Sequence, residues 1–385
     1  MVLYRKYRPK SFSEVAGQEH IVQTLKNAVA GDLLSHAYLF SGPRGSGKTS
    51  LARLLAKAVN CPSTALEVNK TPGEPCNNCA SCEEINHGRA IDLIEIDAAS
   101  NRGIDEMREL REGIAFAPVK LKYKVFIIDE AHQLTKEAAN ALLKTLEEPP
   151  SHAIFILATT EAHKMIPTIA SRCQRFDFRK LTVPEITGKL KEIAKAENAN
   201  IDKTALQLIA LNAGGSLRDA LGLLDKVLTF HSILDTKEGT RPAKLEERSG
   251  IGPDTIKALL GLVDLNLVGE FVQLLADRKA GEAIDFLNKN LEQGMDPQEF
   301  TKNLVRYLRH TLVLKINPQL EKMFANEFTK EQLERIQQQA QQFDEKLLPS
   351  IVENFMEAEQ KMKYSSIVQL PLELAIVDSC MTKAS

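Results

Sequence analysis

The chain has 385 residues, enough for two or three domains of ordinary size. Hydrophobic residues make up 43% of it and charged residues 26%, a composition that excludes a disordered or fibrous protein. Its 49 Lys and Arg are balanced by 51 Asp and Glu, for a formal net charge of −2. The balance excludes a protein that is held to DNA by bulk positive charge alone.

Neither a membrane span nor a signal peptide is visible in the sequence. No run approaches about 18 consecutive apolar residues, and the N-terminal MVLYRKYRPKSF lacks an apolar segment. We therefore expect a cytoplasmic protein without a membrane partner. Its six cysteines are not expected to form disulfides, and the crowding of four of them between Cys61 and Cys82 points to a metal.

Short apolar runs separated by helical patterns predict the buried strands of a parallel α/β sheet. The predicted strands cover residues 37–40, 91–96, 125–129, 153–158 and 174–178. A wholly helical pattern follows over 183–230, and the charged, Gly- and Pro-marked stretch 235–253 is typical of an interdomain linker.

The rest of the chain shows helical periods only. Asp296 and Pro297 form a typical helix start, with an N-cap residue followed by proline at the first helical position. The Gln-rich stretch 337–342 lies within another helical pattern, and we expect it to form a solvated helix face.

The segment GPRGSGKT from Gly42 to Thr49 matches the phosphate-binding pattern G-x-x-x-x-G-K-[ST]. It follows a predicted strand and precedes a predicted helix, a context that disfavours a chance glycine-rich turn. Backbone N–H groups would cradle the phosphates of ATP, Lys48 would place its charge on the β/γ oxygens, and Thr49 would offer a hydroxyl to Mg²⁺. The predicted nucleotide-binding residues are Gly42, Pro43, Arg44, Gly45, Ser46, Gly47, Lys48, Thr49 and Ser50.

The run VFIIDE supplies the acids that such a site needs. A buried strand would deliver Asp129 to its carboxyl end, where open α/β sheets bind ligands, and Asp129 would hold Mg²⁺ through water. Glu130 is the natural group to orient and polarise the attacking water, and its alternative role is an acid at a helix N-terminus. We expect His132 to be packed or hydrogen-bonded rather than catalytic.

Cys61, Cys76, Cys79 and Cys82 form the pattern C-x14-C-x2-C-x2-C. Two-residue spacings let thiolates converge on one ion, and four sulfurs close a tetrahedral site for Zn²⁺. Because such a site has no open position, it would be structural and would tie a loop between the phosphate-loop helix and the next strand. An iron–sulfur cluster and four unrelated thiols are the alternatives.

Together, these residues resemble the bacterial DNA polymerase III gamma/tau subunit family, the ATPase of the sliding-clamp loader. The resemblance is carried by YRKYRPKSFSEVAGQE, HAYLFSGPRGSGKTS, the four cysteines, IIDEAH, LLKTLEEPP, ATTEAHKMIPTIASRC and GGSLRDAL. It implies an α/β P-loop AAA+ module with a zinc insertion, a small helical lid and an all-α collar. The implied boundaries are 1–180 for the ATPase core, about 61–90 for the zinc module, 181–235 for the lid, 236–253 for the linker and 254–385 for the collar.

The resemblance also implies roles for individual residues. Thr160 would be the polar sensor near the γ-phosphate, with Thr159 as the alternative. Arg172, in the string SRC, would be the arginine finger that reaches the ATP of a neighbouring subunit, and a surface ion pair is its alternative role. Arg218 would contact phosphate from the lid of the same chain.

Arg8 and Val15 match the family's N-terminal segment that covers the adenine. Arg102 and Arg108 resemble a loop and helix that track the DNA template, although a solvated basic turn is nearly as good an interpretation, because nearby acids dilute the charge. The implied partners are delta, delta-prime and further gamma/tau subunits in a pentamer, the sliding clamp and primer-template DNA.

Three functions can be compared at this point. The first is a motor whose ATP binding opens the clamp and grips primed DNA, and whose hydrolysis releases both. The second is a scaffold subunit that does not hydrolyse ATP, which the intact P-loop and acid pair disfavour. The third is another AAA+ machine, such as a branch-migration motor, which the four cysteines and the string SRC disfavour. No polymerase active site is evident.

Overall fold

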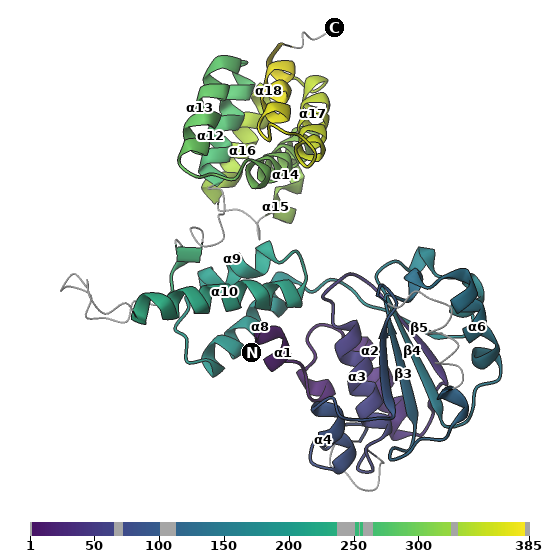
Figure 1. Ribbon diagram of the computed structural model, residues 1–385. Coiled ribbons are helices and arrows are strands. Elements are labelled where there is room, and N and C mark those ends of the chain that lie inside the picture. The colour runs from purple at the N-terminus through teal and green to yellow at the C-terminus, as the bar shows by residue number, and fades with distance from the viewer. Residues whose placement is uncertain are drawn as a thin grey trace. The chain divides into compact units, whose positions relative to one another are not determined.

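The computed structural model describes residues 2–64, 72–100, 113–236, 251–253, 255–256, 265–324 and 330–381. The chain divides into two compact units, Met1–Ile251 and Gly252–Ser385 (Figure 1). Arg102, Arg108 and most of the predicted linker lie outside the described residues. None of the helices in the described ranges has the length and apolarity of a membrane span.

A five-stranded parallel sheet forms the base of the first unit, as predicted. Its strands are β1 (Ala37–Ser41), β2 (Leu93–Asp97), β3 (Lys124–Asp129), β4 (Ala153–Thr159) and β5 (Gln174–Asp177). Their order is β2-β3-β4-β1-β5, and every neighbouring pair is parallel. The inner strands β1 and β4 are buried throughout, whereas the edge strands β2 and β5 are partly exposed.

Helices cover both faces of the sheet, because side chains alternate between faces along each strand. On β3, Val125 and Ile127 pack into one cluster with α2 (Glu19–Ala30) and α3 (Lys48–Val59). Phe126 and Ile128 join the opposite cluster with α6 (Lys136–Glu147) and α7 (Pro167–Ala170). Figure 1 shows α2 and α3 on one side of the strands and α6 on the other.

The remaining elements of this unit lie around the sheet or follow it. Short helices are α1 (Leu3–Lys6), η1 (Phe12–Glu14), α4 (Ala80–Asn86), η2 (Ala131–Gln133) and η3 (Ala162–Lys164). After the sheet come α8 (Val183–Ala196), α9 (Lys203–Asn212) and α10 (Leu217–Thr236), which confirm the predicted helical region. A capping box formed by Thr182 and Glu185 begins α8 and stabilises its first turn.

In its described ranges, the second unit is helical. It comprises α12 (Leu265–Ala276), α13 (Ala280–Glu292), α14 (Pro297–Ile316), η4 (Pro318–Leu320), α15 (Glu321–Phe324), α16 (Lys330–Gln342), α17 (Leu347–Met362) and α18 (Leu370–Met381). Asp296 caps α14 by accepting the Glu299 N–H, as the sequence predicts. The edge-on packing of Phe271 against Phe300, with ring centroids 5.1 Å apart, marks the core.

The prediction of a solvated face for the Gln-rich stretch of α16 is wrong at Gln339. This side chain is 1% exposed, donates a hydrogen bond to the Gly269 carbonyl at 2.7 Å and accepts one from the Tyr307 hydroxyl at 2.7 Å. An amide can replace an apolar residue in a core when both its donor and its acceptor are satisfied.

Candidate nucleotide site and metal centre

The phosphate-binding pattern forms the loop between β1 and α3, at the carboxyl edge of the sheet. Register places Ser41 at the end of β1 opposite Thr159 at the end of β4. Gly42 has φ +147°, and a Cβ there would come within 2.4 Å of the Phe178 carbonyl oxygen, so no larger residue fits. Gly47 has φ +100° and directly precedes α3, whose N-terminal N–H groups thereby face the loop.

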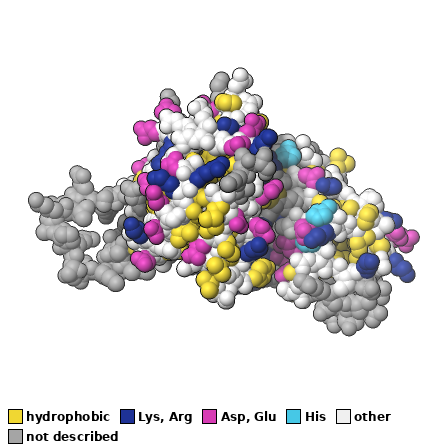
Figure 2. All heavy atoms as spheres, turned by 90° about the horizontal axis from the view of Figure 1, so that it is seen from above, with side chains coloured by type: hydrophobic (Ala, Val, Ile, Leu, Met, Phe, Trp, Pro, Cys, Tyr) yellow, Lys and Arg dark blue, Asp and Glu magenta, His cyan; other side chains and the backbone are white. Residues whose placement is uncertain are grey.

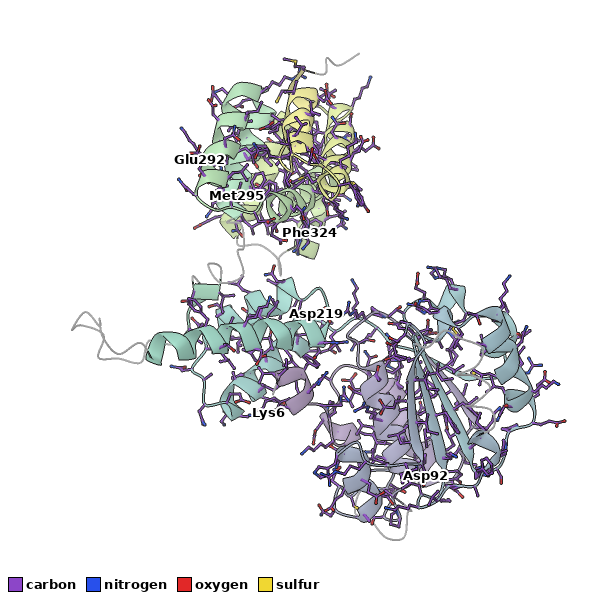
Figure 3. The ribbon with its side chains drawn as sticks, viewed as in Figure 1. Lys6, Asp92, Asp219, Glu292, Met295 and Phe324 are labelled. Carbon is purple, nitrogen blue, oxygen red and sulfur yellow. The ribbon has the colours of Figure 1, made fainter. Side chains whose placement is uncertain are left out.

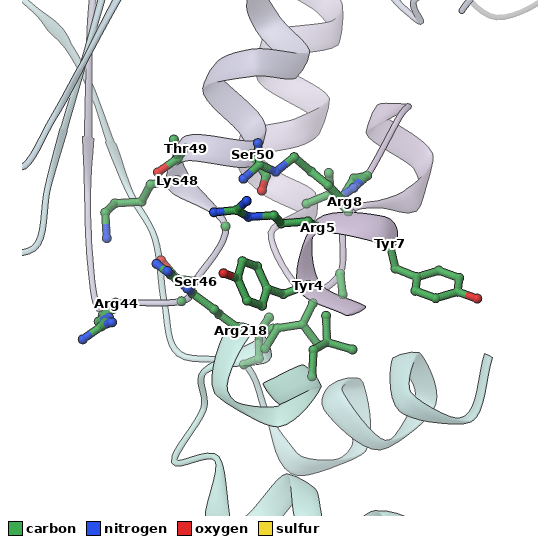
Figure 4. A pocket seen from close by; sticks show the side chains of 18 of the residues that line it. Tyr4, Arg5, Tyr7, Arg8, Arg44, Ser46, Lys48, Thr49, Ser50 and Arg218 are labelled. Atoms are coloured by element: carbon green, nitrogen blue, oxygen red, sulfur yellow. The ribbon is translucent and has the colours of Figure 1, made fainter. Parts of the chain in front are cut away.

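A cavity of about 300 Å³ opens beside this loop (Figure 4). The predicted site residues that line it are Arg8, Val15, Arg44, Gly45, Ser46, Gly47, Lys48, Thr49, Ser50, Asp129, Glu130, Thr160 and Arg218. Gly42 and Pro43 shape the loop without lining the cavity, and Arg172 lies elsewhere. The walls therefore come from the N-terminal segment, the phosphate loop, two strand ends and the start of α10.

Lys48 is the buried cation of this cavity. The residue is only 6% exposed, and its Nζ donates to the carbonyl oxygens of Gly42 at 2.7 Å and Pro43 at 2.9 Å. Burial lowers the pKa of the Lys48 ammonium, while the carboxylates of Glu130 and Asp129 act in the opposite direction. A buried cation beside N–H donors favours an anionic ligand.

Arginines strengthen the positive character of the cavity. Burial and the neighbouring Arg53 lower the pKa of the Arg8 guanidinium. The Arg218 guanidinium lies 5.1 Å from the centroid of the Tyr4 ring, which joins the start of α10 to α1. Tyr4 and Arg5 also line the cavity (Figure 4), and sequence reasoning missed them. The signal that could have identified them is their place beside Arg8 in the same motif, YRKYRPKSFSEVAGQE.

The acid pair lies opposite the phosphate loop. The Thr49 hydroxyl donates to Asp129 Oδ2 at 2.8 Å, so the two predicted Mg²⁺ ligands are already adjacent. Glu130 adopts φ +48°, an uncommon conformation for a residue with a side chain and one that is often found at functional sites.

Thr160, rather than Thr159, contacts the predicted catalytic acid. The Thr160 hydroxyl hydrogen-bonds to Glu130 Oε2 at 2.9 Å, and its backbone N–H does so at 3.3 Å. Thr159 is fully buried, and its hydroxyl lies 2.9 Å from His132 Nδ1. His132 Nε2 lies 3.0 Å from Glu161 Oε2, so the histidine is hydrogen-bonded as expected.

Arg172 is held within its own chain. Its Nη2 lies 2.6 Å from Glu147 Oε1 at the end of α6, and its Nη1 donates to the Thr168 carbonyl at 2.8 Å. This contact is the ion pair that was considered as the alternative role for Arg172. Glu147 was not expected to take part. The side chain of Arg172 remains 34% exposed, so it can be reached from outside.

The four predicted cysteine ligands are brought together. Their Sγ atoms all lie within 4.8 Å of one another, with Cys61 and Cys82 buried. Sulfurs bound tetrahedrally at about 2.3 Å from one ion lie about 3.8 Å apart, so a zinc ion fits this set. The thiols differ in acidity: burial raises the pKa of Cys61 and of Cys82, whereas at Cys76 the N–H groups of Asn78 and Cys79 outweigh burial and lower the pKa to about 6. A thiolate is the form that binds metal.

Comparison with protein families divides the chain into three matched segments. Residues 17–182 match the model "DNA polymerase III, delta subunit", 185–232 match "DNA polymerase III clamp loader subunit, ATPase lid domain", and 251–384 match "DNA polymerase III subunits gamma and tau domain III".

Individual relatives agree with these matches. The chain is 43% identical to DNA polymerase III subunit tau of Bacillus subtilis and 36% identical to subunit gamma/tau of Mycobacterium tuberculosis. Those alignments cover 99% and 100% of this chain but 63% of each relative. The subunit gamma of Buchnera aphidicola is 39% identical over 83% of this chain and 82% of its own length.

Solved structures give more distant matches. RuvB of Thermotoga maritima, a Holliday junction branch migration motor, is 20% identical over 70% of this chain and 78% of its own, with a TM-score of 0.48. The DNA clamp loader delta protein of Bacillus subtilis is 16% identical, covers 94% of this chain and 99% of its own, and has a TM-score of 0.40. Similarities at this level carry no argument about function.

Proposed function

The chain belongs to the gamma/tau family of DNA polymerase III subunits, and we propose that it is the ATP-hydrolysing motor of a sliding-clamp loader. In this role, ATP binding opens the clamp and grips primed DNA, and hydrolysis releases the loaded clamp. The chain spans 63% of the length of its Bacillus and Mycobacterium relatives, so the proposal concerns the part that carries the nucleotide site.

The observation that carries the proposal is the cavity itself. It combines a phosphate loop, the buried Lys48, several arginines and the acids Asp129 and Glu130 in one space of about 300 Å³. Triphosphate oxygens would accept from the loop N–H groups and from Lys48, and the N-terminal segment would cover the base. This arrangement supports an AAA+ module with ATP as its substrate.

Thr49 and Asp129 would hold Mg²⁺, as their 2.8 Å contact already brings the two oxygens together. Bound there, the metal would neutralise charge on the β- and γ-phosphates. Glu130 would accept the proton of the attacking water, and Thr160 would hold the Glu130 carboxylate through its hydroxyl. A sensor at Thr160 would thus respond to the γ-phosphate beside the general base.

Arg172 would act on the nucleotide of a neighbouring subunit. Within this chain it pairs with Glu147, so assembly would exchange that carboxylate for a phosphate. A guanidinium matches the charge that spreads over the transferring phosphoryl group, and such fingers contribute about 10³ to 10⁵ in rate. A scaffold subunit that does not hydrolyse ATP would need neither the acid pair nor Lys48 beside the phosphate loop.

The start of α10 would link nucleotide state to lid position. The Leu217 N–H donates to the Gly45 carbonyl at 3.2 Å, and Arg218 enters the cavity beside it. Phosphate held between Lys48 and Arg218 would therefore fix residues 181–235 against the core. ATP-bound and spent states would differ in affinity for clamp and DNA, which is what couples the cycle.

Zn²⁺ is the proposed resident of the four-cysteine site. A closed set of four thiolates would serve structure, because it leaves no position for substrate. Metal analysis of the purified chain should find one zinc per chain, and its absence would remove this part of the proposal.

The proposed partners are delta, delta-prime and further copies of this chain, with residues 254–385 as the collar that joins them. The clamp and primer-template DNA are the proposed targets. On the face seen in Figure 2, acidic and basic side chains are interspersed, in keeping with the net charge of −2. DNA would therefore be gripped by a few inward residues of the assembled ring, with Arg102 and Arg108 as candidates.

The decisive experiment measures ATP hydrolysis by the chain alone and with delta, delta-prime, clamp and primed DNA. Weak activity alone and strong stimulation by the complete set is the expected result. The variant Glu130→Gln should bind ATP normally but hydrolyse it about 10² to 10⁴ times more slowly. Indifference to the clamp would contradict the clamp-loading role, and undiminished hydrolysis by Glu130→Gln would contradict the assignment of the base.

A further inference from the structure

The N-terminal residues 3–16, called the strap here, form one wall of the nucleotide cavity. Its members that line the cavity are Tyr4, Arg5, Tyr7, Arg8, Pro9, Val15 and Ala16. They come from α1, from the backbone between α1 and η1, and from the two residues after η1. What fixes this backbone therefore controls one side of the site.

One end of the strap is bound to the lid. The Glu197 carboxylate, directly after α8, accepts hydrogen bonds from Lys6 Nζ and the Tyr7 hydroxyl, each at 2.6 Å. Figure 3 labels Lys6 on α1 beside the lid helices. These groups are partly exposed, so the attachment is one that water can loosen.

The other end is bound to the four-cysteine module by a buried carboxylate. Glu74, two residues before Cys76, is 7% exposed. Its two oxygens accept the backbone N–H groups of Phe12 at 2.8 Å and Ser13 at 3.1 Å, and Lys26 of α2 lies 3.1 Å away. Charge-assisted bonds in a buried setting are strong, and they fix the backbone on which Phe12 enters the core.

A buried lysine makes a second, independent attachment. Lys57 of α3 is 2% exposed, and its Nζ donates to the Lys10 carbonyl at 2.6 Å. Its other two bonds go to side-chain oxygens of the module, Asn77 Oδ1 at 2.6 Å and Asn86 Oδ1 at 2.9 Å. Asn77 lies between Cys76 and Cys79, and Asn86 ends the helix that contains Cys82. The position of Lys57 thus depends on the fold of the cysteine loops.

We propose that the four-cysteine module positions the strap through Glu74 and Lys57, and thereby sets the affinity of the nucleotide site. The two residues are positioning residues, since neither lines the cavity. The inference rests on the proposed nucleotide and zinc sites. The module would then do more than hold its own loops together, because it would also set the position of the strap. Thermodynamic linkage makes this effect reciprocal, so bound nucleotide should in turn stabilise the module.

The first test compares two matched carboxylate-to-amide variants of the 385-residue chain. Glu74→Gln alters the carboxylate that holds the strap. Asp92→Asn alters a buried carboxylate directly before β2, which is 1% exposed and accepts backbone N–H groups of residues 119–121. Titration with a fluorescent ATP analogue should show Kd raised about fivefold or more by Glu74→Gln and unchanged by Asp92→Asn. The variant Lys57→Met should behave like Glu74→Gln.

The second test needs no variant. Release of zinc to a chromogenic chelator should be several-fold slower when the wild-type chain is saturated with a non-hydrolysable ATP analogue. In Glu74→Gln, zinc should remain stoichiometric but this protection should be lost. Equal release rates with and without nucleotide would overturn the inference, as would a Kd for Glu74→Gln equal to that of the wild type. A wild-type chain that binds no nucleotide would instead sink the proposed function.

Discussion

The two units differ in the kind of polar group that they bury. Among the described residues, the first unit buries the charged side chains of Lys48, Lys57, Glu74 and Asp92. The buried polar residues of the second unit are Thr301, His310, Thr311, Gln339 and Ser379, with no lysine, arginine, aspartate or glutamate among them in the described ranges. Burying a charge is costly unless partners compensate it, so it persists where the charge has a task that a neutral group cannot perform.

The buried charges of the first unit fall into two groups according to what they contact. Lys48 faces a cavity and is proposed to meet an external anion, whereas Asp92 receives the N–H groups of Val119, Lys120 and Leu121 and organises a loop. Gln339 joins three helices of the second unit by neutral bonds. Among the described residues, buried charge therefore lies either at the proposed nucleotide site or beside backbone groups that no regular element satisfies. The following variants test that division, beginning with the largest expected effect.

Asp92 should be the most costly of these groups to alter for stability. Asp92→Asn removes the charge from three backbone bonds, and we expect the free energy of unfolding to fall by about 3 kcal/mol. Chemical denaturation of the wild type and the variant measures the difference. If Asp92→Asn weakened nucleotide binding without lowering stability, Asp92 would belong with the charges at the nucleotide site instead.

Lys48 should behave in the opposite manner. Lys48→Ala removes a cation that is proposed to contact phosphate, and nucleotide affinity should fall about 100-fold, equivalent to about 2.7 kcal/mol. Stability should change little, because the variant also removes the cost of burying the ammonium group. The comparison fails if Lys48→Ala unfolds readily while its affinity for nucleotide, measured by calorimetry, stays unchanged.

Gln339 tests the neutral side of the comparison. Gln339→Leu leaves the Tyr307 hydroxyl and the Gly269 carbonyl without their partner, and stability should fall by about 2 kcal/mol. Burial raises the pKa of Tyr307 to about 12, so its hydroxyl remains a donor at neutral pH. The double variant with Tyr307→Phe should recover part of the loss. Nucleotide affinity should match the wild type in both.

Glu185 supplies the smallest effect and a dependence on pH. Its bidentate bond with Arg179, together with the Thr182 N–H, lowers the pKa of Glu185 to about 2. Because the folded-state pKa lies below the unfolded value, the stabilisation is present above about pH 4.5 and is lost as the pH falls towards 2. Its side chain is 25% exposed, so we expect only about 1 kcal/mol.

Urea unfolding of Glu185→Gln and the wild type at pH 7 and pH 3 measures this effect. The difference between the two proteins should be larger at pH 7. Glu19→Gln is the control, because Glu19 lies 3.8 Å from Arg179 and is 76% exposed. A difference that grows on acidification would contradict the assigned sign.

The residues that local patterns predicted do lie together in the structure, because each of those patterns describes residues that are only a few positions apart in the chain. The interval from Gly42 to Thr49 is one loop and one helix start, and Cys76, Cys79 and Cys82 converge within a single turn and short helix. The continuous apolar run of β3 likewise indicated a buried strand, and its side chains pack into clusters on both faces of the sheet. Glu197 lies outside every motif and gave no such signal, and the motif LLKTLEEPP, which contains Glu147, did not indicate that this residue pairs with Arg172.

The amino-acid sequence alone determined the parallel sheet, the helical regions, the phosphate loop, the acid pair and the cysteine set, because periodicity and ligand spacing are local properties of a chain. The tertiary structure selected Thr160 over Thr159 as the partner of Glu130 and paired Arg172 with Glu147. It also buried Gln339 and joined Glu74 and Lys57 to the strap. These contacts join residues that are 25 to 70 positions apart, from Arg172 and Glu147 to Gln339 and Gly269. Such pairings follow only from how the elements pack.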